Sequence, residues 1–191
     1  MKIAYLMNTY PLTSTTFIRR EIESLEAMGL KIQRYAVRKW SDKLVDPLDI
    51  ADQSRTQYLL SGNTIKLFTS FFIVLFSNPI GFLKALNLWI NVCRNSIHIS
   101  FKHFAYLLQA THFYRLCKQN NLQHVHTHFS TNATTVAMLA KQMGGPSYSF
   151  TAHGPDEFVD PTALSMHLKV QHASFVVAIS NYCRVQLVRF S

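Results

Sequence analysis

The sequence predicts an α/β protein with a doubly wound, Rossmann-like parallel sheet. Short apolar stretches alternate with helical stretches near both ends of the chain, an order typical of parallel sheets. The 191 residues are 48% hydrophobic, which is enough to bury the core of one domain. Because no internal repeat, low-complexity segment or flexible linker divides the sequence, we expect residues 1–191 to form a single domain.

The first forty residues have the pattern of a βαβ unit. Residues 1–7 are a short apolar run that predicts a strand. Residues 14–29 predict a helix with one apolar face, with Ser14 or Thr15 as its N-cap and Gly29 as its C-cap. Residues 30–38 predict the next strand, parallel to the first and reached by a right-handed crossover.

The composition then changes twice. Residues 40–61 are polar and contain Pro47, which predicts a surface excursion. Residues 65–76 are strongly apolar, but the sequence Ser-Asn-Pro interrupts them after twelve residues, well short of the ~20 that a membrane-spanning helix needs. A membrane span is therefore rejected.

The middle of the chain carries a one-sided charge. No Asp or Glu occurs between Asp52 and Asp156, whereas eight Lys and Arg do. Residues 79–95 and 99–119 predict two amphipathic helices within a helical excursion at about 62–118, and their only charges are basic. A positive surface of this kind attracts nucleic acid, anionic lipid or phosphorylated small molecules. Basic and aromatic residues are not interleaved on a strand or recognition helix, so we expect no nucleic-acid partner and expect an anionic membrane surface.

The last third of the chain returns to alternating short elements. It predicts three further strand-then-helix steps. The expected strands are residues 122–129, 146–152 and 173–180, and the expected helices are residues 131–144, 163–168 and 181–190.

The cysteines indicate a reducing compartment. Cys93, Cys117 and Cys183 are far apart, odd in number and without CxxC spacing, which predicts free thiols. The apolar run after Lys2 is too short for the hydrophobic core of a signal peptide. The expected location is the cytoplasm.

Glycine-rich phosphate loops are absent from the sequence, which contains neither GxGxxG nor GxxxxGK[ST]. The loop after the first strand instead offers the hydroxyls of Ser14 and Thr15 at a helix N-terminus. Such a place can hold an anion or a sugar hydroxyl, and it can equally be plain N-capping.

Three histidines alternate along one predicted strand. His124, His126 and His128 therefore point to the same face of the sheet, where three imidazoles could in principle hold a metal ion. We expect no metal there, because no cysteine or carboxylate is nearby in the sequence and each ring would need an outer partner. His128 is at the carboxyl end of the strand, where open α/β sheets bind their ligands.

A fourth histidine, His153, follows the next predicted strand. Gly154 allows close backbone approach and Pro155 fixes the turn. A lone histidine is usually structural, but two histidines at two strand ends beside a polar loop favour a shared cleft. Asp156 and Glu157 are either general acid and base groups or charges that favour the following helix; we assign Glu157 to the helix and leave Asp156 open.

Three segments carry a family resemblance: "YPLTSTTFIRREI", "HVHTHFSTNATTVAMLAKQMGGPSYSFTAHGPDEF" and "FVVAISNYCRVQL". In this order and spacing they resemble the N-terminal domain of family-4 retaining glycosyltransferases of the GT-B fold, especially those that build bacterial exopolysaccharide and lipopolysaccharide. The resemblance spans nearly the whole chain. One departure is Thr15, which stands where the family usually has an acid, so any role for a carboxylate at this position is in doubt. The matching positions are Tyr10, Pro11, Ser14, Thr16, Phe17, Ile18, Glu21, His126, Thr127, His128, Phe129, Thr151, Ala152, His153, Gly154, Asp156, Ile179, Ser180 and Tyr182.

The resemblance implies the acceptor-binding half of an enzyme that moves a sugar from a nucleotide-sugar to a lipid-linked or oligosaccharide acceptor. It implies that His153 is catalytic and contacts the transferred sugar, and that Ser14, Thr16, His128 and Asp156 bind substrate. No metal or cofactor is implied, because the nucleotide-sugar co-substrate is held mainly by a C-terminal donor domain. That domain is not found in these 191 residues, so we expect the chain alone to be inactive.

The resemblance leaves one alternative open. The expected location is cytoplasmic, peripheral on the inner face of the plasma membrane. A non-catalytic membrane-surface scaffold derived from a glycosyltransferase would explain the basic amphipathic helices, but it would not explain the histidine loops.

Overall fold

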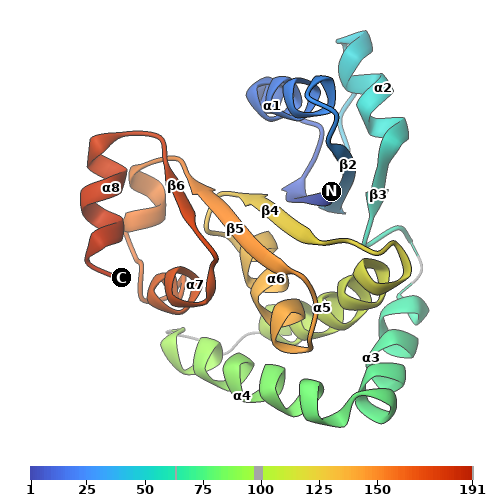
Figure 1. The fold of residues 1–191 in the computed structure, drawn as a ribbon, viewed down its shortest axis with the longest axis vertical. Coiled ribbons are helices and arrows are strands. Elements are labelled where there is room, and N and C mark those ends of the chain that lie inside the picture. The colour runs from blue at the N-terminus through green and yellow to red at the C-terminus, as the bar shows by residue number, and fades with distance from the viewer. Residues whose placement is uncertain (63, 97–100, 191) are drawn as a thin grey trace.

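A six-stranded parallel sheet forms the centre of the molecule (Figure 1). The computed structural model describes residues 1–62, 64–96 and 101–190. The strand order is β3-β2-β1-β4-β5-β6, with every neighbouring pair parallel, so the predicted doubly wound α/β fold is confirmed. The strands are β1 (Lys2–Thr9), β2 (Lys31–Arg38), β3 (Thr56–Tyr58), β4 (His124–His128), β5 (Ser147–Ala152) and β6 (Val176–Ala178).

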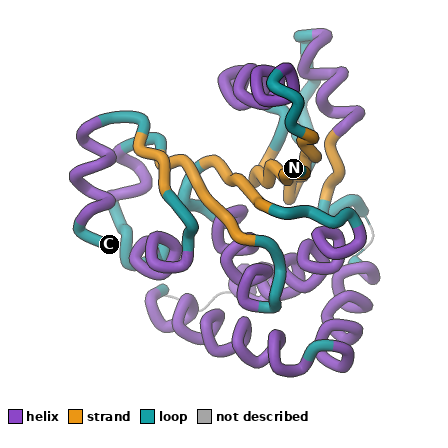
Figure 2. Tube along the Cα trace, in the orientation of Figure 1, coloured by secondary structure: helices purple, strands orange, loops and turns teal. Residues whose placement is uncertain are grey.

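Helices pack on both sides of this sheet. Figure 1 shows α1 and α2 above it and α3 to α6 below it, and Figure 2 shows the same layers by element type. Helix α6 packs directly on β1, β4 and β5, α5 lies beside α6, and α3 and α4 pack against this pair. The helices are α1 (Thr16–Ala27), α2 (Pro47–Arg55), α3 (Ile65–Ser77), α4 (Pro79–Asn95), α5 (Phe101–Gln119), α6 (Asn132–Gln142), α7 (Met166–His172) and α8 (Asn181–Val188), with 3-10 turns η1 (Thr13–Thr15) and η2 (Pro155–Phe158).

Alternation along the strands divides the core in two. Ala4 and Leu6 of β1 point into the main core beneath the sheet, together with Val125 of β4 and Phe150 of β5. The intervening residues of β1 point to the other side, where they form a smaller cluster with α1. Its buried members are Ile3, Tyr5, Met7, Tyr10, Ile18, Ile22, Ile32 and Ala36.

The surface excursion predicted for residues 40–61 is wrong in part, because this segment contains α2 and the edge strand β3. Helix α2 is polar because the side chains on its buried face form ion pairs with arginines. Asp49 is 2.9 Å from the Arg19 guanidinium of α1, and Asp52 is 3.1 Å from that of Arg34 in β2. Buried charges are tolerated when they are paired in this way.

The apolar run at residues 65–76 forms most of helix α3. In the described part of the chain, no helix is by itself long and apolar enough to cross a membrane; α3 and α4 meet that test of length and composition only as a pair, bent by 118°. The predicted start of the next helix at Ile99 and Ser100 lies outside the described residues.

Candidate functional site

A pocket of about 470 Å³ lies on the α1 side of the sheet. Its floor is made by β4 and β5, Phe17 and Leu25 of α1 form one wall, and Phe175 and Val177 at β6 form the opposite wall. The carboxyl ends of parallel strands meet at one end of this pocket, which is the usual ligand edge of an open α/β sheet.

The floor is a ladder of imidazoles and hydroxyls. The β4–β5 register places His124 opposite Ser147, His126 opposite Ser149 and His128 opposite Thr151. The Ser149 hydroxyl is 2.7 Å from His124 Nε2 and 2.8 Å from His126 Nδ1. His126 Nε2 is 3.0 Å from Thr151 Oγ1. The side chains of His124, His126, Ser149 and Thr151 are joined across the strands in this way, which offsets the cost of burying their polar atoms.

His128 and His153 meet at the carboxyl end of the floor. His128 Nδ1 is 2.9 Å from His153 Nε2, and the Phe17 ring lies against both imidazoles, with ring centroids 5.7 and 5.0 Å away. The Phe129 ring lies against His153, with centroids 4.3 Å apart and the rings tilted by 35°. Phe129 has a left-handed φ of 67°, which is a strained conformation for a bulky residue. Strain of this kind concentrates at functional sites.

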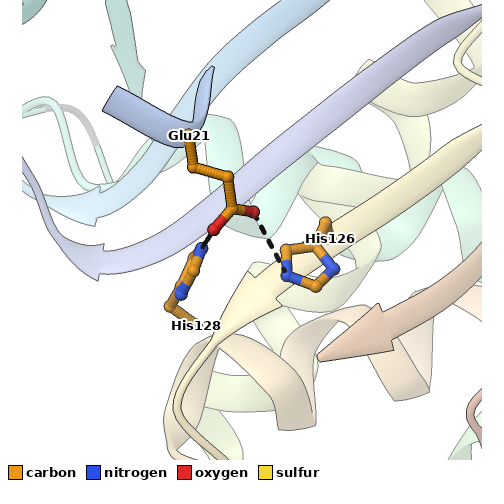
Figure 3. A group of neighbouring side chains, drawn as sticks. All are labelled: Glu21, His126 and His128. Atoms are coloured by element: carbon orange, nitrogen blue, oxygen red, sulfur yellow. Dashed lines mark ion pairs between the residues drawn. The ribbon is translucent and has the colours of Figure 1, made fainter. Parts of the chain in front are cut away.

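Glu21 of α1 points down onto two of the floor histidines (Figure 3). Its carboxylate oxygens lie 3.6 Å from His128 Nε2 and 4.0 Å from His126 Nε2. The Tyr5 hydroxyl donates a 2.6 Å hydrogen bond to the same carboxylate. These three side chains and Tyr5 bring α1, β1 and β4 together in one polar cluster.

The ionisation of the cluster follows from burial and proximity. Burial raises the pKa of the Glu21 carboxyl, but its contacts with His128 and Tyr5 outweigh burial and lower the pKa to about 2. Burial, together with the neighbouring His128, lowers the pKa of His126 to about 3. The pKa of His153 is also lowered, first by burial and then by His128. At neutral pH, Glu21 is a carboxylate beside neutral His126 and His153.

A second carboxylate fixes the loops after β4 and β5. Glu157 is buried and accepts hydrogen bonds from the backbone N–H groups of Ser130, His153 and Gly154, the last two at 2.5 and 3.3 Å. The buried Lys169 ammonium of α7 donates to the Ser130 carbonyl at 2.6 Å. Burial lowers the pKa of Lys169 to about 7, while the charge of Glu157 opposes the shift. Glu157 was expected to favour the helix that follows it; it lies within the turn η2 and joins the loops after β4 and β5.

The site residues expected from the sequence fall into two groups. His128 and His153 are in contact and both line the main pocket. Asp156 is exposed in η2, and Ser14 is exposed in η1. Neither Ser14 nor Thr16 lines the main pocket or the neighbouring pocket of about 230 Å³, which Thr15, His128 and Phe129 line.

The sequence does not assign Glu21, Tyr5 or Lys169 to the site. Glu21 belongs to the family pattern, but its place beside β4 depends on the packing of α1 over a strand about a hundred residues later in the chain. The predicted fold alone indicates that α1 lies near β4, because the first helix of a doubly wound sheet packs near the strands that flank the first strand.

No protein-family model matches the chain, and no curated protein matches it at a significant level.

Proposed function

We propose that this chain is the acceptor-binding half of a retaining glycosyltransferase of the GT-B type, acting in bacterial surface polysaccharide synthesis. The observation that carries the proposal is the contact between His128 and His153 at the carboxyl edge of the sheet, beside a pocket large enough for a sugar. The family resemblance implies that His153 contacts the transferred sugar and that His128 binds substrate. The donor is a nucleotide-sugar, and the acceptor is lipid-linked or an oligosaccharide.

In this proposal His153 orients the transferred sugar. Its Nε2 atom is engaged with His128 Nδ1, so its Nδ1 atom is the one available for a sugar hydroxyl. The rings of Phe17 and Phe129 both contact the His153 ring, and Glu157 accepts a hydrogen bond from the His153 backbone N–H. A positioning bond to a ring fixed in this manner acts mainly in the transition state.

The other proposed binding residues surround this point. Ser14 of η1, Thr16 at the start of α1 and the exposed Asp156 approach the acceptor or the donor diphosphate from outside the pocket. The diphosphate itself is held mainly by the donor domain that the resemblance implies, through cationic groups and a helix N-terminus, so no metal is required for it.

The outer helices supply the membrane contact in the proposal. Helix α3 buries Leu67 and Val74, yet it also exposes an apolar stripe at a spacing of three to four residues. Lys66 of α3 and Lys84 of α4 are exposed, and each basic residue near an anionic surface contributes about 1 kcal/mol. The exposed apolar residues on α3 and α4 are Ile65, Phe68, Phe72, Ile73, Phe76, Ile80, Leu83 and Ile90.

This stripe also favours a second candidate function, a non-catalytic scaffold at the membrane surface. A scaffold would bind anionic vesicles without binding sugar. The enzyme half would bind both.

Imidazole NMR during titration of the chain with oligosaccharides tests the proposal. An acceptor glycan should shift the His153 and His128 resonances, while UDP- and GDP-sugars should bind weakly and show no turnover. The variant His153→Ala should abolish the glycan response without unfolding the chain, and it should lower kcat/KM roughly ten- to a thousandfold in an enzyme that includes the donor domain. His124→Ala is the matched control, because His124 lies on the same floor but does not contact His153.

Tight nucleotide-sugar binding by these 191 residues would place the donor site in this half and contradict the assignment. Vesicle binding with no glycan response would favour the scaffold.

A further inference from the structure

We propose that Glu21, His126 and His128 bind one divalent transition-metal ion of the zinc class at the floor of the pocket. The inference is independent of the proposed sugar transfer and of the donor diphosphate. It departs from the expectation that the histidine strand binds no metal. That expectation depended on the lack of a nearby carboxylate in the sequence, and α1 brings one to the strand.

The potential ligand atoms of Glu21, His126 and His128 lie close together. One ligand atom from each side chain, an imidazole Nε2 or a carboxylate oxygen, lies within 4.8 Å of the other two. Ligand atoms about 2.0 to 2.1 Å from a tetrahedral zinc ion lie about 3.3 Å from one another, so a bound ion needs only a modest contraction. The Glu21 side chain is 41% exposed and has room to make most of that movement.

A buried ring nitrogen of His128 faces the Glu21 carboxylate. His128 is only 2% exposed, and its Nε2 atom has no hydrogen-bond partner among the residues that the structure describes. The nearest carboxylate oxygen of Glu21 is 3.6 Å away, and the pair between Glu21 and His126 is 4.0 Å apart. Both separations are too long for hydrogen bonds. With Nε2 unprotonated, a cation bound between the imidazole and the carboxylate would satisfy both groups, and the two spacings leave room for an ion that all three residues share.

Each of the three candidate ligands also contacts a second side chain that would support it when a metal is bound. His126 Nδ1 bonds to Ser149 Oγ at 2.8 Å, and His128 Nδ1 bonds to His153 Nε2 at 2.9 Å. Tyr5 donates to the Glu21 carboxylate. In the tautomer whose Nδ1–H donates to these partners, both Nε2 lone pairs face the ion, and the Tyr5 hydroxyl orients the carboxylate. Thr151, which contacts His126 Nε2 at 3.0 Å, can turn its hydroxyl away when the nitrogen binds metal.

The ligand set selects the class of ion. Two imidazoles and one carboxylate suit Zn²⁺, whereas Mg²⁺ and Ca²⁺ prefer oxygen ligands throughout. Three protein ligands leave a coordination position open, and the cluster lines the main pocket. The open position would take an oxygen donor, either water or a hydroxyl of a pocket ligand.

Calorimetry with ZnCl₂, together with the visible spectrum of the Co²⁺-loaded chain, tests this proposal. The wild-type chain should bind one ion per chain, and Co²⁺ should give the intense d–d absorption of a low-coordinate nitrogen and oxygen site. Glu21→Gln and His128→Gln should each weaken binding at least about a hundredfold, beyond the ~10 to 100-fold typical for loss of an outer partner. Mg²⁺ should give no signal in the calorimeter.

Two control variants distinguish the site from adventitious binding. Glu23→Gln removes an exposed carboxylate from the same helix, and His167→Gln removes a histidine of α7; both should bind Zn²⁺ like the wild type. Binding that falls equally in the controls, or that persists in Glu21→Gln and His128→Gln, overturns the proposal. If a variant fails to fold by circular dichroism, imidazole NMR of the wild type decides: Zn²⁺ must shift His126 and His128 first, and shifts elsewhere alone overturn it.

Discussion

Strands β4 and β5 have two faces that are both buried but are built from opposite chemistry. On the covered face, beneath the sheet, Val125, Tyr148 and Phe150 pack into the main core and are at most 2% exposed. On the pocket face, His126 is 8% exposed and Ser149 is fully buried, yet their polar atoms are joined across the strands. Burial alone therefore does not separate core from site in this protein. The core and the site differ in whether their buried atoms form hydrogen bonds, because buried polar atoms can also form hydrogen bonds with a ligand.

The largest expected effect tests the covered face. Phe150→Ala should lower the free energy of unfolding by about 3 to 5 kcal/mol, since it removes a fully buried ring and leaves a cavity. Ser149→Ala, one residue away on the pocket face, should cost about 1 to 3 kcal/mol, because it leaves two imidazoles without their shared hydroxyl. Urea unfolding measures both variants. Equal losses would mean that the two faces contribute alike to stability.

A smaller effect is expected at Lys169, a charge placed in the covered layer. Its folded pKa of about 7 lies below the ordinary lysine value of about 10.4, so the unfolded chain holds more protons between these two pH values. Stability should therefore rise with pH from about 7 to about 10, by up to about 1.4 kcal/mol per pH unit. Lys169→Met should remove this slope in urea unfolding at pH 7, 8 and 9. The exposed Lys66→Met is the control and should keep it.

The smallest effect on stability is expected outside the core, on the helices that form the covering layer. Phe76 of α3 is 79% exposed, so Phe76→Ser should change the free energy of unfolding by no more than about 0.5 kcal/mol. The same change should clearly reduce co-sedimentation with anionic vesicles, because it removes an apolar group from the proposed membrane face. Phe76→Leu should retain binding. Equal recovery of the wild type with neutral and anionic vesicles would contradict the electrostatic part of the proposal.

The comparison of the two faces also explains what the sequence could predict. Alternation placed His124, His126 and His128 on one face of a strand, and the position of His128 and His153 after neighbouring strands predicted that they would lie close together. These inferences need only the period of a strand and the direction of a parallel sheet. The polar segment at residues 40–61 was missed because α2 buries ions rather than apolar groups, and β3 has only three residues.

The remaining site residues depend on contacts that no local pattern encodes. Glu21 reaches His128 only because α1 lies over β4, and the sequence of α1 alone does not determine the angle at which it packs on the sheet. The N-cap hydroxyls of the first loop were a fair guess, but Thr15 uses its side chain to bond the backbone of Leu12. Ser14 is left exposed on the outer side of the turn.

The two hydrogen bonds that bind the backbone of Ser130 have a consequence for the order in which the chain folds. Its N–H is bound by Glu157, 27 residues later in the chain, and its carbonyl by Lys169, 39 residues later. The turn after β4 can therefore reach its final shape only after η2 and α7 have docked. In native-state hydrogen exchange, the Ser130 amide should become exposed in the same opening event as the amides of α7, and not with those of the adjacent strand β4.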